Sequence, residues 1–496
     1  MSFGRGAARE GAGRSFFVVV AALTACAPNR AAAPVDGRSP PARESATSDG
    51  APTCRYDVAV AHPTAQLDVT AHCTGAVTTH FAGDRHLTPF ITDVRDGNGA
   101  ALARDGARFV VPASNDVRIR YHVDLDGAAR VETDVDTAFA LGGSLVAPLS
   151  SYALVPEPPR PGVAIVHVQP GPSADFVTEL ARAGGDYTIA LSDIPDATYG
   201  VFGRFEHDVV ALAGVHGTSS VDVLSLDGAF ASSRLERKEW VARAAAAVGA
   251  FYGGFPAERA GVVLDPIPAR DRVVFGKVLS GGGSTVALFV GANTPRASLD
   301  SDWVLVHEFF HLGFPSFRGE GKWLDEGLAT YFEPLIRARA GMLTEEQGWA
   351  EVIRDMPLGV ELCETRGLDH FDGDIRAVYW GGAVVALLAD VAARRREENA
   401  PGLEQALRAM LAQGWNSRHV VRLRDAIQKV DAGLGAPILE GLAAAYSDHG
   451  SPVPLDSVLA DLGVERHGDG VLLRDDAKLA RVRRAIMYGD AAFATR

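Results

Sequence analysis

Residues 307–311 read HEFFH, and residues 323–331 read WLDEGLATY. Positions four apart share one face of an α-helix, so His307 and His311 can direct their imidazoles at one ion. Glu326, in the second segment, would add a carboxylate and leave a fourth position open, which is typical of catalytic zinc sites rather than structural ones. The two segments therefore predict a zinc centre made of His307, His311 and Glu326, with Glu308 beside it. The alternative is a helix with two solvent-facing histidines.

The residues around the two segments predict a pair of antiparallel helices. We expect residues 300–301 to begin the first helix and Gly313, followed by a proline, to end it. A second helix is expected from about 323 to 334, after a loop with two glycines. Three residues of the first helix recur at helical spacing, and we expect them to face a core: Trp303, Val306 and Phe310.

These segments resemble the gluzincin metallopeptidases, most closely the glycyl aminopeptidase family, and the aminopeptidase N branch is similar. The resemblance implies a thermolysin-like catalytic domain with His307, His311 and Glu326 as Zn²⁺ ligands and Glu308 as general base. It also implies a tyrosine that binds the developing oxyanion. Tyr379, in the segment VYWGGA (378–383), is the candidate, and a core tyrosine is the alternative.

The implied mechanism uses the acidity of a water on zinc, whose pKa falls to about 7. Glu308 would take the proton of this water and pass it to the leaving amine. Thr330 lies one turn after Glu326 and is predicted to hydrogen-bond a ligand, with an ordinary surface threonine as the alternative.

Two features depart from the aminopeptidase N pattern. The gap between His311 and Glu326 has 14 residues, which is shorter than in those relatives. Where they carry a glutamate that binds the substrate amine, this chain reads LSGGGST (279–285) and offers no carboxylate. Gly281, Gly282 and Gly283 are predicted to bind substrate by pairing with its backbone.

The N-terminus predicts export. Arginines at 5, 9 and 14 precede an apolar run, 16–23, that is too short to span a bilayer. The run ends LTAC (23–26), which resembles a bacterial lipoprotein cleavage box, so residues 1–26 would be a signal peptide and Cys26 the lipidated residue. An ordinary signal peptide cut nearby is the alternative. Residues 27–52 have the composition of a disordered tether. We expect a chain anchored to the bacterial cell envelope, facing the periplasm or in the outer membrane.

Cysteine and charge agree with this location. Cys54 and Cys73 flank two expected strands, and a disulfide between them is plausible in an oxidising compartment, with two free thiols as the alternative. Cys363 is expected to be buried or inert. The net charge of −14 argues against nucleic-acid binding.

The sequence predicts a multidomain α+β protein. We expect a β-rich N-terminal domain over 53–170, a gluzincin catalytic domain over 171–345 and a helical region over 346–496. No run after Leu23 was expected to be long and apolar enough to span a membrane. The predicted function is that of a zinc-dependent, aminopeptidase-like peptidase acting on peptides or proteins. A zinc endopeptidase of the peptidase MA type, or a peptide-binding protein that retains the fold, are the alternatives.

Overall fold

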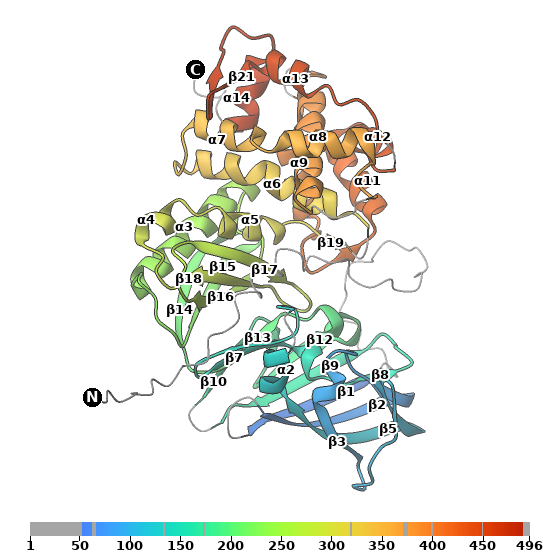
Figure 1. Ribbon diagram of the computed structural model, residues 1–496. Coiled ribbons are helices and arrows are strands. Elements are labelled where there is room, and N and C mark those ends of the chain that lie inside the picture. Colours follow the sequence, from blue (N-terminus) through green and yellow to red (C-terminus); the bar gives the residue numbers. More distant parts are fainter. Residues whose placement is uncertain are drawn as a thin grey trace, which may run out of the picture.

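The computed structural model describes residues 52–61, 66–131, 134–171, 174–317, 320–370, 375–397, 400–448 and 450–489. The predicted signal peptide, Cys26 and the tether as far as residue 51 lie outside these residues. The described chain runs from a β-rich N-terminal part, through a mixed sheet, to a helical part (Figure 1).

The N-terminal part is built on two sheets, because its apolar residues alternate along long strands and bury one face. A nine-stranded sheet has the order β11-β12-β9-β1-β2-β5-β3, with β4 on β5 and β8 on β2. A four-stranded sheet has the order β10-β13-β7-β6. The strands of the first sheet are β1 (Thr53–Ala61), β2 (Gln66–Ala82), β3 (Ile91–Asp96), β4 (Arg104–Asp105), β5 (Arg108–Asp124), β8 (Val155–Glu157), β9 (Val163–Gln169), β11 (Ala181–Ala183) and β12 (Asp186–Ala190). Those of the second are β6 (Phe139–Leu141), β7 (Ser144–Pro148), β10 (Asp175–Thr178) and β13 (Tyr199–Gly203), and a short helix α2 (Leu125–Val131) follows β5.

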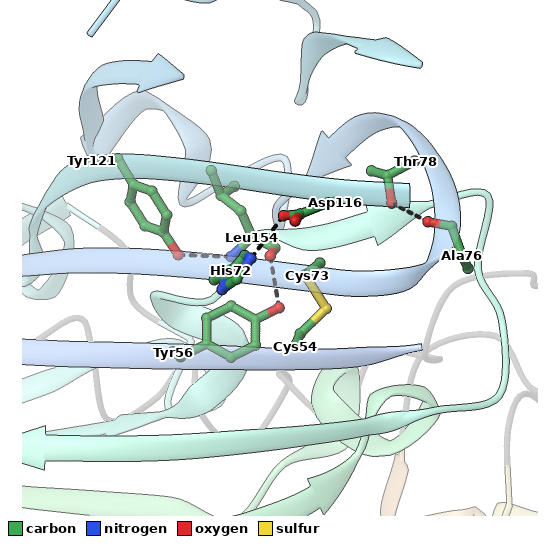
Figure 2. The surroundings of a disulfide bond; sticks show 9 residues. All are labelled: Cys54, Tyr56, His72, Cys73, Ala76, Thr78, Asp116, Tyr121 and Leu154. Carbon is green, nitrogen blue, oxygen red and sulfur yellow. Dashed lines mark hydrogen bonds and ion pairs between the residues drawn. A yellow bond between two sulfur atoms is a disulfide. The ribbon is translucent and has the colours of Figure 1, made fainter. Parts of the chain in front are cut away.

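A disulfide bond joins the first two strands of this domain. Cys54 and Cys73 are direct partners in the antiparallel register of β1 and β2, and their sulfur atoms lie 2.03 Å apart. Figure 2 shows the bond next to Tyr56, whose hydroxyl donates to the Leu154 carbonyl oxygen at 2.9 Å. The cross-link closes a loop of 19 residues within the sheet and limits the freedom of the unfolded chain there.

The N-terminal domain extends further than the sequence suggested. Strands β10 to β13, which cover residues 175–203, pair with β9 and β7 and so complete its two sheets. The predicted boundary at residue 170 is therefore wrong, and the boundary lies near Arg204. The strands are short, and a 3-10 helix (Leu191–Asp196) separates β12 from β13, so the sequence shows little alternation there.

The second part contains a five-stranded mixed sheet in the order β14-β15-β16-β18-β17. Its three inner strands are parallel to one another, and both outer strands are antiparallel to their neighbours. Edge strand β17 lies beside the helix that carries the HEFFH residues, as described below. The strands are β14 (Phe205–Gly214), β15 (Gly217–Leu226), β16 (Arg259–Ile267), β17 (Val273–Leu279) and β18 (Thr285–Gly291).

Helices cover this sheet and share one apolar core with it. Helix α3 (Arg234–Tyr252) begins at Ser233, which accepts from the Glu236 amide while Glu236 bonds back to Ser233. The other helices that frame the site are α4 (Arg296–Asp300), α5 (Val304–His311), α6 (Lys322–Arg339) and α9 (Ile375–Arg394). Gly327 on α6 and Gly382 on α9 let these two helices touch, because a Cβ at Gly382 would lie 1.7 Å from the Trp323 carbonyl oxygen.

The C-terminal part is mainly helical, as expected, but it also holds short strands. A hairpin, β21 (Val464–His467) and β22 (Gly470–Leu473), precedes the last helix, and β19 (Ser316–Phe317) pairs with β20 (Val420–Val421). Among the described residues, α9 is long and apolar enough to cross a membrane, which contradicts the expectation from the sequence. Since 72% of its apolar window is buried inside the protein, α9 is the core helix of this part. The remaining helices are α7 (Glu345–Ile353), α8 (Met356–Thr365), α10 (Leu403–Ala412), α11 (Leu423–Leu434), α12 (Ile438–Tyr446), α13 (Leu455–Leu462) and α14 (Ala480–Tyr488).

Candidate metal centre

Helix α5 positions the two histidines. It begins at Val304, because the Asp302 carboxylate accepts the amides of Val304 and Leu305 at 3.2 and 3.0 Å. The predicted start at 300–301 is therefore wrong, since these residues end α4 and border it. The rings of His307 and His311 lie one helical turn apart, with centroids 5.0 Å from each other.

One residue of this helix lies on an unexpected face. Val306 and Phe310 are buried, as predicted, but Trp303 is 51% exposed. Its ring packs edge-on against His307, with centroids 5.8 Å apart and planes at 90°. Trp303 therefore lies on the face of the metal ligands, and the prediction that it faces the core is wrong.

Glu326 on α6 meets both histidines. Its Oε2 atom lies 3.2 Å from Nε2 of His307 and 3.3 Å from Nε2 of His311. Two ligands each about 2.1 Å from a tetrahedral zinc ion are separated by about 3.4 Å. The three side chains, whose ligand atoms all lie within 4.8 Å of one another, therefore fit a zinc ion. These are the three residues that the sequence predicts as ligands.

Asp325 fixes the orientation of His311, and this role was not predicted from the sequence. Nδ1 of His311 lies 2.7 Å from Oδ1 of Asp325, so Nδ1 carries a proton and Nε2 is left for a metal. Lys322 also contributes, since its ammonium group lies 3.1 Å from the other carboxylate oxygen of Glu326. The sequence signal that could have identified Asp325 is its position directly before the predicted ligand Glu326.

The charges of these groups depend on one another. Burial alone would lower the pKa of His311, but the carboxylates of Asp325 and Glu326 raise it well above its usual value. Burial would raise the pKa of Glu326, but Lys322 and His311 hold it well below the usual range. The site thus favours a charged carboxylate between cationic groups, and a bound metal would replace protons on the histidines.

Glu308 points toward strand β17. A Cβ added at Gly276 would lie 2.6 Å from Cγ of Glu308, so only a glycine leaves room for this side chain. Removal from bulk water raises the pKa of Glu308, and the neighbouring His307 and His311 oppose that rise. The next strand residue, Lys277, forms an ion pair with Asp136 of the N-terminal domain at 3.2 Å. Gly276, Lys277 and Asp136 were not identified from the sequence because the strand has no motif.

The ring of Tyr379 lies beside that of His307. The two rings are nearly parallel, at 6°, with centroids 6.2 Å apart. The close contact of α9 with α6 at Gly382 places the tyrosine there. The structure thus brings Tyr379 to the site, and its catalytic role stays a prediction.

The remaining predicted site residues lie further out. Thr330 is partly exposed on α6, and its role stays a prediction. Gly281 donates its N–H to the Asp196 carbonyl oxygen at 2.8 Å, and its own oxygen accepts from the Thr198 amide at 2.9 Å. Its backbone groups are therefore already bonded to the N-terminal domain. Substrate pairing by Gly281, Gly282 and Gly283 stays a prediction, and the free edge of β17 beside them is the alternative place for it.

Comparison with solved structures shows the fold. An aminopeptidase N family protein from Idiomarina loihiensis aligns with a TM-score of 0.61 and 14% identity, over 83% of this chain and 78% of that one. An M1 zinc metallopeptidase from Deinococcus radiodurans aligns with a TM-score of 0.51 and 17% identity, over 82% and 95% of the two chains. The chain has the fold of the M1 zinc metallopeptidases. A two-domain M1 zinc metallopeptidase variant bound to L-tryptophan shares it as well, with a TM-score of 0.51 and 15% identity over 82% of this chain and 96% of that one.

The M1 fold is evident from comparison of structures and not from comparison of sequences. No family model matches the chain, and no curated protein matches it. The M1 arrangement of a β-rich domain before a mixed sheet and paired helices agrees with the multidomain α+β class predicted from the sequence.

Proposed function

We propose that the chain is a zinc-dependent peptidase with Glu308 as its general base. The observation that carries this proposal is that Oε2 of Glu326 lies 3.2 and 3.3 Å from Nε2 of His307 and His311, close to the edge length of a zinc tetrahedron. Glu308, one residue from a ligand and beside the edge strand β17, supports the assignment. The M1 fold agrees with it.

Each residue then has a defined task. Bound zinc would polarise the scissile carbonyl and acidify a coordinated water. Glu308 accepts a proton from the attacking water and donates it to the leaving amine. Tyr379, whose ring is nearly parallel to that of His307, donates a hydrogen bond from its hydroxyl to the developing oxyanion. Asp325 keeps the His311 ring oriented, and the free edge of β17 pairs with the substrate backbone.

We further propose an aminopeptidase-like specificity. The segment 279–285 has no carboxylate for a substrate amine, but Asp136 reaches β17 from the N-terminal domain. Its Oδ2 lies 3.2 Å from Nζ of Lys277, and its Oδ1 is buried without a hydrogen-bond partner among the described residues. A substrate α-amine would share this carboxylate with Lys277. An endopeptidase, the rival activity, would need no such group.

The test is cleavage of a peptide library that contains each sequence with a free amine and with an acetylated amine. The zinc-loaded protein and its Glu308→Gln variant are compared. We expect cleavage of the free-amine peptides and a loss of at least about 100-fold in the variant, with unchanged zinc content. Equal cleavage of acetylated peptides would favour the endopeptidase. An active variant would overturn the mechanism, and inactivity of both proteins would favour a peptide-binding protein.

We also propose that the protein is exported and lipid-anchored at Cys26. The apolar run before LTAC supports this, and the Cys54–Cys73 disulfide is typical of proteins outside the reducing cytoplasm. Mass spectrometry of the mature N-terminus is the test. We expect a diacylated residue 26, and a mature chain that begins elsewhere without lipid would reject the anchor.

A further inference from the structure

Trp303 is exposed to solvent, whereas most other tryptophans of the chain are buried. Four of them are at most 8% exposed, and they lie in the core or at its edge: Trp240, Trp323, Trp349 and Trp380. A single exposed aromatic residue is ordinary on a protein surface. What distinguishes Trp303, 51% exposed, is its place against a metal ligand.

The spacing along α5 explains that place. Trp303, His307 and His311 lie four positions apart in sequence, so they form one stripe along the helix. Glu326 covers the histidine end of this stripe. Trp303 continues the stripe beyond His307, toward solvent, and carries the largest apolar surface of any side-chain type.

The backbone beneath Trp303 is held firmly. Asp302 is buried and accepts two amides of the first turn of α5. Arg337 donates to the Ser301 carbonyl oxygen at 3.0 Å, and Arg243 pairs with Asp300. A ring on so fixed a backbone loses little freedom when a ligand packs on it.

We propose that Trp303 determines substrate specificity by giving an apolar shelf to the side chain of a residue that flanks the scissile bond. The occupant is an aromatic or large aliphatic side chain of the peptide. This inference rests on the proposed peptidase function. Contact with the His307 ring fixes one side of the indole, and the exposed remainder is available for the substrate. Contact between an aromatic ring and a large apolar side chain discriminates by about 10-fold or more against alanine.

The test compares Trp303→Ala and Trp303→Phe with the unaltered protein on two peptide series. One series varies the residue before the scissile bond and the other varies the residue after it, each between phenylalanine, leucine and alanine. We expect the phenylalanine-to-alanine ratio of kcat/KM to fall about 10-fold in one series for Trp303→Ala and to recover partly in Trp303→Phe. Leu235→Ala, which removes a 62% exposed side chain from α3, is the matched control and should keep the ratio. Ratios that stay the same in both series would overturn the proposal.

Two further measurements separate the possible causes. Zinc content should not change in Trp303→Ala, and a loss of zinc would show that the indole only supports His307. Peptide affinity is measured by calorimetry in the Glu308→Gln background, with and without Trp303→Ala. A preference for phenylalanine peptides that disappears with the indole supports the shelf even if no turnover is found. The absence of any preference overturns it, whereas absent turnover alone would count only against the proposed function.

Discussion

Gly276→Ala should disable the proposed base while leaving the metal site intact. The added Cβ would lie 2.6 Å from Cγ of Glu308, whereas carbon atoms in contact are about 3.5–4.0 Å apart. A relative movement of about 1 Å is therefore required. Strand β17 is held by its register with β18, where Gly276 faces Leu288, and α5 is anchored by the buried Phe309 and Phe310. The Glu308 side chain is the part that can move.

A displacement of about 1 Å in a catalytic group can cost about 100-fold in rate, and loss of a general base costs about 100-fold to 10,000-fold. We expect kcat/KM to fall about 100-fold, which corresponds to about 2.7 kcal/mol. The assay is turnover of a free-amine peptide, with zinc stoichiometry and the melting temperature measured on the same sample. Zinc content should stay that of the unaltered protein, because the ligand atoms do not touch Gly276.

The control is Gly185→Ala, since Gly185 also lacks a positive φ but has no atom within 4 Å of its added Cβ. It should retain full turnover. Unchanged turnover in Gly276→Ala, with zinc bound, would refute the assignment of Glu308 as a tightly positioned base. Loss of zinc in Gly276→Ala would instead mean that the whole helix moves, and the packing argument would be wrong.

Three other perturbations test two residues beside the metal ligands and one buried carboxylate. Asp325→Asn should weaken zinc affinity about 10-fold to 100-fold, because the amide holds the His311 ring less firmly. Competition with a chelator measures this affinity, and an unchanged value would mean that the Asp325–His311 hydrogen bond does not support metal binding. Tyr379→Phe should bind zinc and fold normally but lower kcat by about 100-fold if the hydroxyl binds the oxyanion; wild-type turnover would remove it from the mechanism. Burial raises the pKa of Glu179 to about 8, although Arg259 opposes this rise. A folded-state pKa above the unfolded one gives stability that is present at low pH and lost as pH rises toward about 8. The melting temperature of the unaltered protein should therefore fall between pH 5 and 8 more steeply than that of Glu179→Gln, and equal slopes would contradict the assignment.

The metal site could be predicted from the sequence because its chemistry depends on local spacing. His307 and His311 are one turn apart on a single helix, and a motif of this kind fixes both atoms. Glu326 was found because a second motif surrounds it. Gly276 and Asp136 could not be found in this way, since they reach Glu308 and Lys277 through packing of a strand on a helix and through domain contact rather than through neighbours in the sequence.

Trp303 shows a different limit. On a helix, Trp303 lies close both to Val306, three positions on, and to His307, four positions on. Its spacing therefore fits either the apolar face with Val306 and Phe310 or the face of His307. Trp303 was predicted to face the core because its spacing to Val306 and Phe310 is helical. The structure decides otherwise, since α5 begins only at Val304 and residue 303 is its cap. The domain boundary at 170 failed for a related reason, because strands of three to five residues do not show a clear period.

The short connection between the two ligand helices explains why the C-terminal part cannot be separated from the site. Only 14 residues lie between His311 and Glu326, and they include β19, whose Ser316 amide donates to the His419 carbonyl oxygen at 2.9 Å. The Ser417 amide bonds in turn to the Leu312 carbonyl oxygen at 3.3 Å, directly after α5. A segment about 100 residues downstream thus holds the start and the middle of the connection. We therefore expect residues 417–421 to help position Glu326 relative to the histidines. A chain that ended before residue 417 should bind zinc more weakly even with every motif residue present, and unchanged zinc affinity would contradict this.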